Sequence, residues 1–329
     1  RYHRAFAAPD FLFRSFQMIN FRKKYPIIAG TLCAILMLAV QAVVQAGFAL
    51  LTENMTYPKY LPMLLADAVC IAVGIALAFA LGLKDIFRSS HEGFLHGLGT
   101  GGYFIFISVS TLIVSISSSK HGAPLSSVEI AVFVLAMAAV GFAEEIFFRG
   151  ILSRMIFEKY GEDACGVWFS AIVSGLIFGS VHFINALHAD IVGVAVQAVC
   201  AAAIGICLTA LYYRTGNIYV VASLHAFMDF CALFSSGVFG EGSLSGTISN
   251  YSPLQLISAL PYIVVSLVLL RRLKMAALLH KPSDSIIAVI GKLSSSQKSK
   301  NRLMWLIFCI VLAGLAVYAA KVIRLAIKL

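Results

Sequence analysis

The sequence predicts an all-α fold, a polytopic bundle of about 8–9 transmembrane helices. Of its 329 residues, 60% are hydrophobic and only 12% are charged, and the mean hydropathy is +0.92. A soluble domain carries about 25% charged residues. The apolar residues gather in long runs, and lipid cannot bond a bare backbone, so each run is expected to be a helix.

Nine apolar segments approach the roughly 20 residues that a membrane crossing requires. The first lacks a clear cleavage site, so we expect an anchor rather than a signal peptide. The last precedes a basic tail, so it either crosses the membrane or lies on the cytoplasmic surface. The segments are 27–51, 61–83, 94–117, 128–148, 167–183, 191–211, 218–234, 254–270 and 303–320.

Lysine and arginine are distributed unequally between the two sides of the predicted bundle. With the N-terminus in the cytoplasm, the inside segments up to residue 302 carry 20 of them and the outside loops carry two, Lys59 and Lys120. This asymmetry follows the positive-inside rule. The net charge of +10 therefore belongs to the membrane flanks and forms no separate basic domain, so we expect no nucleic-acid partner.

The chain is expected to have three parts. Residues 1–127 hold an N-terminal cytoplasmic segment and three flanking spans, 128–234 form the core, and 235–329 hold C-terminal spans with a basic cytoplasmic linker at about 271–302. The glycines between Gly97 and Gly102, with Gly175 and Gly179, are expected to let helices pack closely. The seven cysteines show no CxxC, so neither a disulfide framework nor a zinc ribbon is expected.

Three polar clusters interrupt the apolar core. Ionisable groups are expensive at membrane depth and usually mark a functional site. Carboxylates and imidazoles together are the groups that activate a water molecule. The clusters are Glu144-Glu145 with Arg149, His182, and His225 with Asp229.

In the first cluster, helical spacing separates the two glutamates. Glu145 and Arg149 are four residues apart and share a helix face, so they are expected to pair. Glu144 is rotated by about 100°, so its carboxylate stays available as a base. Alternatively, all three residues form a cytoplasmic helix end and extend to the lipid headgroups.

The two histidines also have structural alternatives. His182 lies within a predicted span, where it can equally bond a neighbouring helix. His225 and Asp229 share a helix face and can bind one small object, or simply bond each other. Asp67 and Glu129 lie toward the outside ends of their spans and are expected to be interfacial.

Depth sets a condition on the site. At 1.5 Å per residue, Glu144 lies about 6 Å from the end of its apolar run, and His182 lies about 22 Å from the cytoplasmic start of its own. The two can meet only if the Glu144 helix continues to about Met155 or if the spans tilt.

The motifs EExxxR, FxxxH and HxxxD, in this order, resemble the CPBP family, the CAAX-protease and bacteriocin-processing family of intramembrane endopeptidases. The resemblance covers about residues 128–234. It implies that Glu144 is the general base, that it polarises a water together with His182, and that Phe178 packs around the site. It further implies that Glu145 and Arg149 shape and neutralise the site.

The resemblance assigns His225 and Asp229 to the oxyanion that forms on the scissile carbonyl. Family members that process prenylated proteins usually carry Asn where this chain has Asp229. An ionised Asp cannot donate a hydrogen bond, whereas a protonated Asp can, and an Asp that only orients His225 need not.

Metal, location and partners follow from the same resemblance. It favours a glutamate-activated water with no obligatory metal, although Glu144, His182, His225 and Asp229 are also plausible zinc ligands. We expect a bacterial plasma membrane with the N-terminus in the cytoplasm. The expected partners are the bilayer and a peptide or protein substrate, such as a prenylated C-terminus or a bacteriocin-like leader.

Two other classes of function remain open on the sequence. Members of the resembled family are also linked to bacteriocin self-immunity and to modulation of membrane partners, a non-catalytic role. A transporter also buries Glu and His. Against transport, the sequence shows neither inverted repeats nor paired broken helices.

Overall fold

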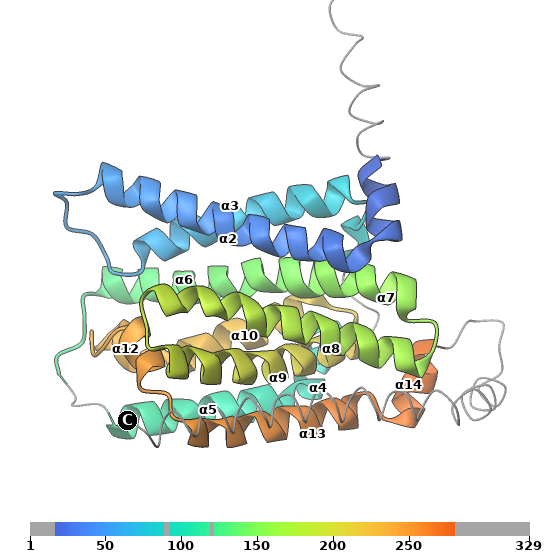
Figure 1. Cartoon of the computed structure of the whole chain (residues 1–329). Helices are drawn as coiled ribbons and strands as arrows, with labels where there is room; N and C mark the ends of the chain where they lie inside the picture. Colours follow the sequence, from blue (N-terminus) through green and yellow to red (C-terminus); the bar gives the residue numbers. More distant parts are fainter. Residues whose placement is uncertain (1–16, 89–92, 119–121, 280–329) are drawn as a thin grey trace, which may run out of the picture. The chain divides into compact units, whose positions relative to one another are not determined.

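The computed structural model describes residues 17–88, 93–118 and 122–279 (Figure 1). The regular elements of these residues are all helices, so the predicted all-α class is confirmed for them. The predicted ninth segment, 303–320, and the linker from residue 280 onward lie outside the described residues. The chain divides into two compact units, residues 1–159 with 215–241, and residues 160–214 with 242–329.

The first unit is built around a long helix and the helices that pack on it. The elements α2 and α3 lie side by side, α3 packs on α6, and α10 packs on both α5 and α6 (Figure 1). The elements of this unit are α2 (Pro26–Leu51), α3 (Leu61–Ala80), η1 (Lys84–Phe87), α4 (Gly93–Thr100), α5 (Gly102–Ser118), α6 (Ser127–Glu145), η2 (Ile146–Ser153), α10 (Ile218–Ala232) and α11 (Phe234–Val238). From η2, the helix α7 (Arg154–Tyr160) leads into the second unit.

The elements α6, η2 and α7 form one continuous helix of 34 residues, Ser127–Tyr160. It begins with a capping box, in which Ser126 and Glu129 satisfy each other's backbone N–H groups. The predicted end at residue 148 is therefore wrong. Apolar residues after Arg149 continue the buried face, and Leu152 packs closely against Gly30 of α2. The condition that the Glu144 helix reach Met155 is met.

The predicted span 94–117 is a bent pair rather than one straight helix. Its two halves, α4 and α5, meet at an angle of 65°. The break falls at Gly101, among glycines that disfavour a continuous helix. Gly97 fits closely against α10, because a Cβ there would lie 2.5 Å from Val220 Cγ2. Close packing is thus confirmed at Gly97.

The second unit contains the helix that leads into the FxxxH motif and a second helix that packs closely against it. Gly175 and Gly179 of α8 let the α9 backbone approach, since a Cβ on them would lie 2.7 Å from Ile206 N and 2.4 Å from Ala198 O respectively. The predicted close packing of these glycines is confirmed. The elements are α8 (Ala164–Val181), η3 (His182–Leu187), α9 (Ile191–Thr215), α12 (Leu244–Ser249), η4 (Pro253–Ser258), α13 (Ala259–Leu269) and α14 (Arg272–Leu279).

The described helices indicate an integral membrane protein. Five of them are long and apolar enough to cross a membrane, or six if the bent pair is one span. Large apolar side chains on α2, such as Val43 and Leu50, are exposed, as expected of a surface that faces lipid. The helices 218–232 and 253–269 are apolar but shorter. The total of eight or nine spans stays a prediction.

Candidate functional site

The site of the first unit is built where α6 and α10 approach most closely. A Cβ at Gly141 would lie 2.7 Å from Ala226 N and 2.9 Å from Ala222 O, so the two backbones can meet only because this residue is glycine. About one turn further along α6 come Glu144 and Glu145. The close approach brings these two short acidic side chains within reach of His225 on α10.

Glu145 and Arg149 form a buried ion pair. Arg149 Nη1 lies 2.8 Å from Glu145 Oε1, and neither side chain has any exposed surface. The predicted pairing at four-residue spacing is confirmed. The alternative, in which these residues extend to the headgroups at a helix end, is wrong for this pair, because both are buried inside the unit.

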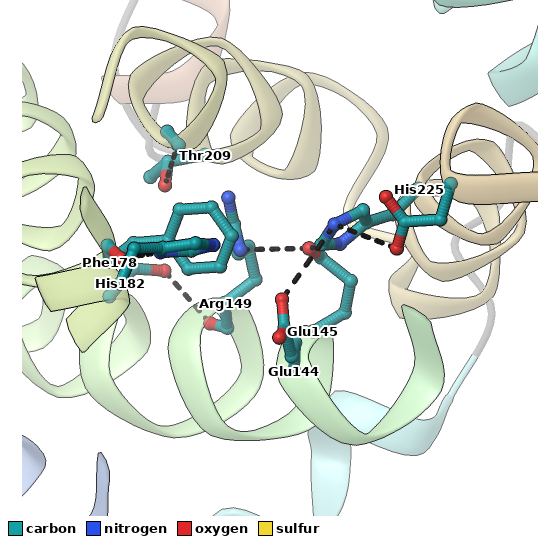
Figure 2. A network of polar contacts seen from close by, with 10 residues as sticks. Glu144, Glu145, Arg149, Phe178, His182, Thr209 and His225 are labelled. Atoms are coloured by element: carbon teal, nitrogen blue, oxygen red, sulfur yellow. Dashed lines mark hydrogen bonds and ion pairs between the residues drawn. The ribbon is translucent and has the colours of Figure 1, made fainter. Parts of the chain in front are cut away.

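His225 is a second partner of Glu145. Its Nδ1 lies 2.8 Å from Glu145 Oε1, and because the carboxylate accepts, Nδ1 is the donor (Figure 2). This bond directs Nε2 toward Glu144 Oε2 at 3.7 Å and Asp229 Oδ2 at 3.6 Å. Both distances exceed a hydrogen bond, so the simple His225–Asp229 bond expected as an alternative is not formed.

The carboxylates of the cluster differ in their access to solvent. Glu145 has no exposed surface, whereas 18% of the Glu144 side chain and 26% of the Asp229 side chain are exposed. One glutamate is therefore bound to Arg149 and His225 inside the unit, while its neighbour keeps an accessible face. Such a pair combines a fixed support with a group able to exchange protons with water.

Asp67 is a further buried carboxyl group of the first unit, and sequence reasoning missed its partner. It lies on α3, is 1% exposed, and accepts a hydrogen bond of 2.7 Å from Gln41 Nε2 of α2. Its predicted interfacial depth in the membrane stays a prediction. A lone Asp in a long apolar run, with a Gln in the preceding run, was the available signal.

In the second unit, the FxxxH motif ends a helix. The α-helix α8 ends at Val181 and His182 begins the 3₁₀ segment η3, within a helical span Ala164–Leu187 that contains the predicted segment 167–183. The backbone N–H of His182 donates to Gly179 O and Ser180 O, so it does not donate to the carbonyl of Phe178 as a further α-helical turn would. The His182 ring bonds this carbonyl instead, with Nδ1 2.9 Å from Phe178 O.

This bond fixes the chemistry of the His182 ring. A carbonyl only accepts, so Nδ1 carries a proton, and Nε2 of the neutral ring is the basic nitrogen. The ring of Phe178 packs edge-on against it, with centroids 5.1 Å apart at 74°. The four-residue spacing of the motif therefore sets both the orientation and the tautomer of the histidine.

The predicted site residues thus fall into two groups. Glu144, Glu145, Arg149, His225 and Asp229 meet in the first unit, and Phe178 and His182 meet in the second. A water shared by Glu144 and His182 stays a prediction. Within the described ranges, no three His, Cys, Asp or Glu side chains are arranged to hold a metal ion.

Comparison with known families agrees with the motifs. Residues 126–231 match the family model described as "Type II CAAX prenyl endopeptidase Rce1-like". Over this segment the chain is similar to that family. The matched residues include every predicted site residue, and they confirm the resemblance to the CAAX-protease family. Comparisons with curated proteins and with solved structures find no match.

Proposed function

We propose that this Rce1-like protein is an intramembrane endopeptidase in which Glu144 and His182 activate a water molecule. One observation supports this assignment most strongly. The buried Glu145 binds Arg149 and His225 at once, and the adjacent Glu144 keeps 18% of its side chain exposed beside His225 Nε2. Such a division between a fixed support and an accessible carboxylate suits a general base that activates water.

In the proposed reaction, Glu144 takes a proton from the water as the water oxygen attacks the carbonyl carbon of the peptide bond. His182 Nε2 accepts the second hydrogen bond of that water, because Nδ1 is occupied by Phe178 O. The carbonyl oxygen becomes an oxyanion. When the C–N bond breaks, Glu144 returns its proton to the leaving amine, so the net reaction consumes one water.

His225 and Asp229 are placed in this proposal beside the oxyanion. With Nδ1 bonded to Glu145, a protonated His225 donates from Nε2, the nitrogen on the side of Glu144 and Asp229. The positive charge of Arg149 balances the negative charge of Glu145, so the Glu145 carboxylate stays ionised and fixed in place.

The remaining parts of the proposal concern the surroundings. We propose that no metal is obligatory, with zinc on the acidic and imidazole groups as the alternative to test. The lysine and arginine distribution supports a cytoplasmic N-terminus. We place the protein in a bacterial plasma membrane. Its proposed partners are the bilayer and a membrane-associated, prenylated or leader peptide, with no nucleic acid.

Cleavage of membrane peptides by purified protein in proteoliposomes tests the function. We expect wild type to cut a prenylated or leader-type peptide, and Glu144→Gln to lose about 10²–10⁴-fold in rate. Glu129→Gln is the matched control on the same helix, because Gln can also complete the capping box. A chelator is added in parallel and should change nothing.

Three results would contradict the proposal in different ways. Full activity of folded Glu144→Gln would remove the proposed base. Loss of activity with chelator would move the chemistry to zinc. No cleavage of any peptide, together with Glu144→Gln cells that behave as wild type, would favour the non-catalytic role in immunity or partner modulation.

A further inference from the structure

A short basic helix precedes the first long apolar helix. Residues 17–24 are helical, and we call them the N-terminal helix. The chain leaves this helix through Tyr25, whose backbone is not helical, with φ −130° and ψ 62°. Pro26 then begins α2, because proline suits the first turn of a helix and disfavours the helical conformation in the residue before it. Figure 1 shows the N-terminal helix in dark blue, turned across the direction of α2.

One face of the N-terminal helix is fixed to the first unit. Ile19 packs at the turn that follows α3. Arg22 is 6% exposed, and its guanidinium donates a hydrogen bond to Glu158 of α7. Lys159 donates from its ammonium to the backbone carbonyl of Lys24. These contacts set the orientation of the helix, so its opposite face is directed away from the unit.

The opposite face carries an apolar row. Met18, Phe21 and Tyr25 recur at spacings of three and four residues, which places them on one side of a helix. Their exposed fractions are 38%, 43% and 43%. Beyond the turn at Pro26, exposed apolar side chains continue on α2, on the kind of surface that faces lipid. They include Ile28, Leu32 and Ile35.

Basic side chains accompany this apolar row. Lys23 and Lys24 are exposed, and the N-terminal helix contains no Asp or Glu. Neither lysine forms an ion pair with any residue that the structure describes, and Glu158 is already bound to Arg22. Lys24 Nζ lies 5.1 Å from the ring centroid of Tyr25. Aromatic and basic side chains in this combination are typical of the headgroup level of a membrane.

We propose that the exposed face of the N-terminal helix is a binding surface for anionic phospholipid headgroups. The apolar row enters the boundary between headgroups and acyl chains, and Lys23 and Lys24 reach the lipid phosphates. The two positive charges favour an anionic lipid over a zwitterionic one. The apolar row favours a lipid over a free phosphate ion. This lipid contact does not depend on the proposed peptidase activity.

Amide hydrogen exchange of residues 17–25 tests the proposal on the full chain, with one copy in each nanodisc. Each lysine near an anionic surface shifts the binding equilibrium by about 5-fold, so exchange should be about 25-fold slower in phosphatidylglycerol than in phosphatidylcholine. The difference should vanish in Lys23→Gln with Lys24→Gln, and should decrease in 1 M salt. The control is Arg271→Gln with Arg272→Gln, an exposed basic pair of the second unit, which should keep the difference.

Four results would overturn the proposal. Equal exchange in the two lipids would show that the headgroup charge is not recognised. A difference retained without Lys23 and Lys24 would place the recognition elsewhere. Equally slow exchange in phosphatidylcholine after addition of inorganic phosphate would assign the surface to a free anion. Slow exchange found only in nanodiscs that hold two copies would assign it to a second copy of this chain.

Discussion

The buried pair of Glu145 and Arg149 gives the sharpest prediction of stability. The variant Arg149→Met removes the guanidinium and leaves Glu145 inside the unit with His225 as its remaining partner. At an effective dielectric constant of about 20, two unit charges 2.8 Å apart attract by about 6 kcal/mol. Removing one partner of a fully buried pair costs about 3–5 kcal/mol of unfolding free energy.

The double variant separates this charge effect from lost packing. In Arg149→Met with Glu145→Gln no charge is stranded, and the Gln oxygen can still accept from His225 Nδ1. We expect the double variant to be more stable than Arg149→Met, at a cost of about 1–2 kcal/mol relative to wild type. The assay is unfolding in mixed detergent micelles, followed by circular dichroism.

A second ion pair of the same unit serves as the matched control. Arg154 and Asp85 lie 2.9 Å apart, but their side chains are 36% and 45% exposed. Asp85→Asn should therefore cost less than about 1 kcal/mol. Equal costs for Arg149→Met and Asp85→Asn, or a double variant as unstable as the sum of its parts, would refute the reasoning from burial.

Two further predictions concern packing and pH. Gly141→Ala should lower the free energy of unfolding by about 1–3 kcal/mol and lower activity, because its Cβ meets the backbone of Ala226. Gly47→Ala is the control: nothing lies within 4 Å of its Cβ, so it should be neutral or stabilising by up to about 1 kcal/mol. Thermal unfolding compares the two variants, and equal shifts of their melting temperatures would contradict the close approach. Lys59 lies in the loop before α3, and burial lowers the pKa of its ammonium, which donates to Ser236 Oγ. As pH rises from that lowered pKa to the usual lysine value, the folded chain loses the proton first, so the free energy of unfolding should increase in wild type but not in Lys59→Met. Parallel curves of unfolding free energy against pH for the two proteins would contradict this prediction.

Local spacing predicted the parts of the site that depend on one helix. The Glu145–Arg149 pair follows from a separation of four residues. The packing of Gly175 and Gly179 follows from the absence of a side chain. The long apolar runs predicted the all-α class. These features depend on neighbours in sequence, and periodicity carries that information.

Features that depend on tertiary contacts were not predicted. The bond of His225 to Glu145 joins residues 80 apart. Hydropathy counting ended one helix at residue 148, because it treats Arg149 as a border, although buried pairing lets the helix continue. The hydrogen bond that Gln41 donates to Asp67 was also not predicted, because hydropathy does not show which helices are neighbours.

The central claim is that Glu144 activates a water for attack on a peptide bond. The most direct measurement is mass spectrometry of the products after cleavage in water enriched in oxygen-18, by wild type and by Glu144→Gln. We predict one heavy oxygen in the new C-terminal carboxyl group with wild type, and no product above background with Glu144→Gln. Labelled product formed at the wild-type rate by folded Glu144→Gln would contradict the account.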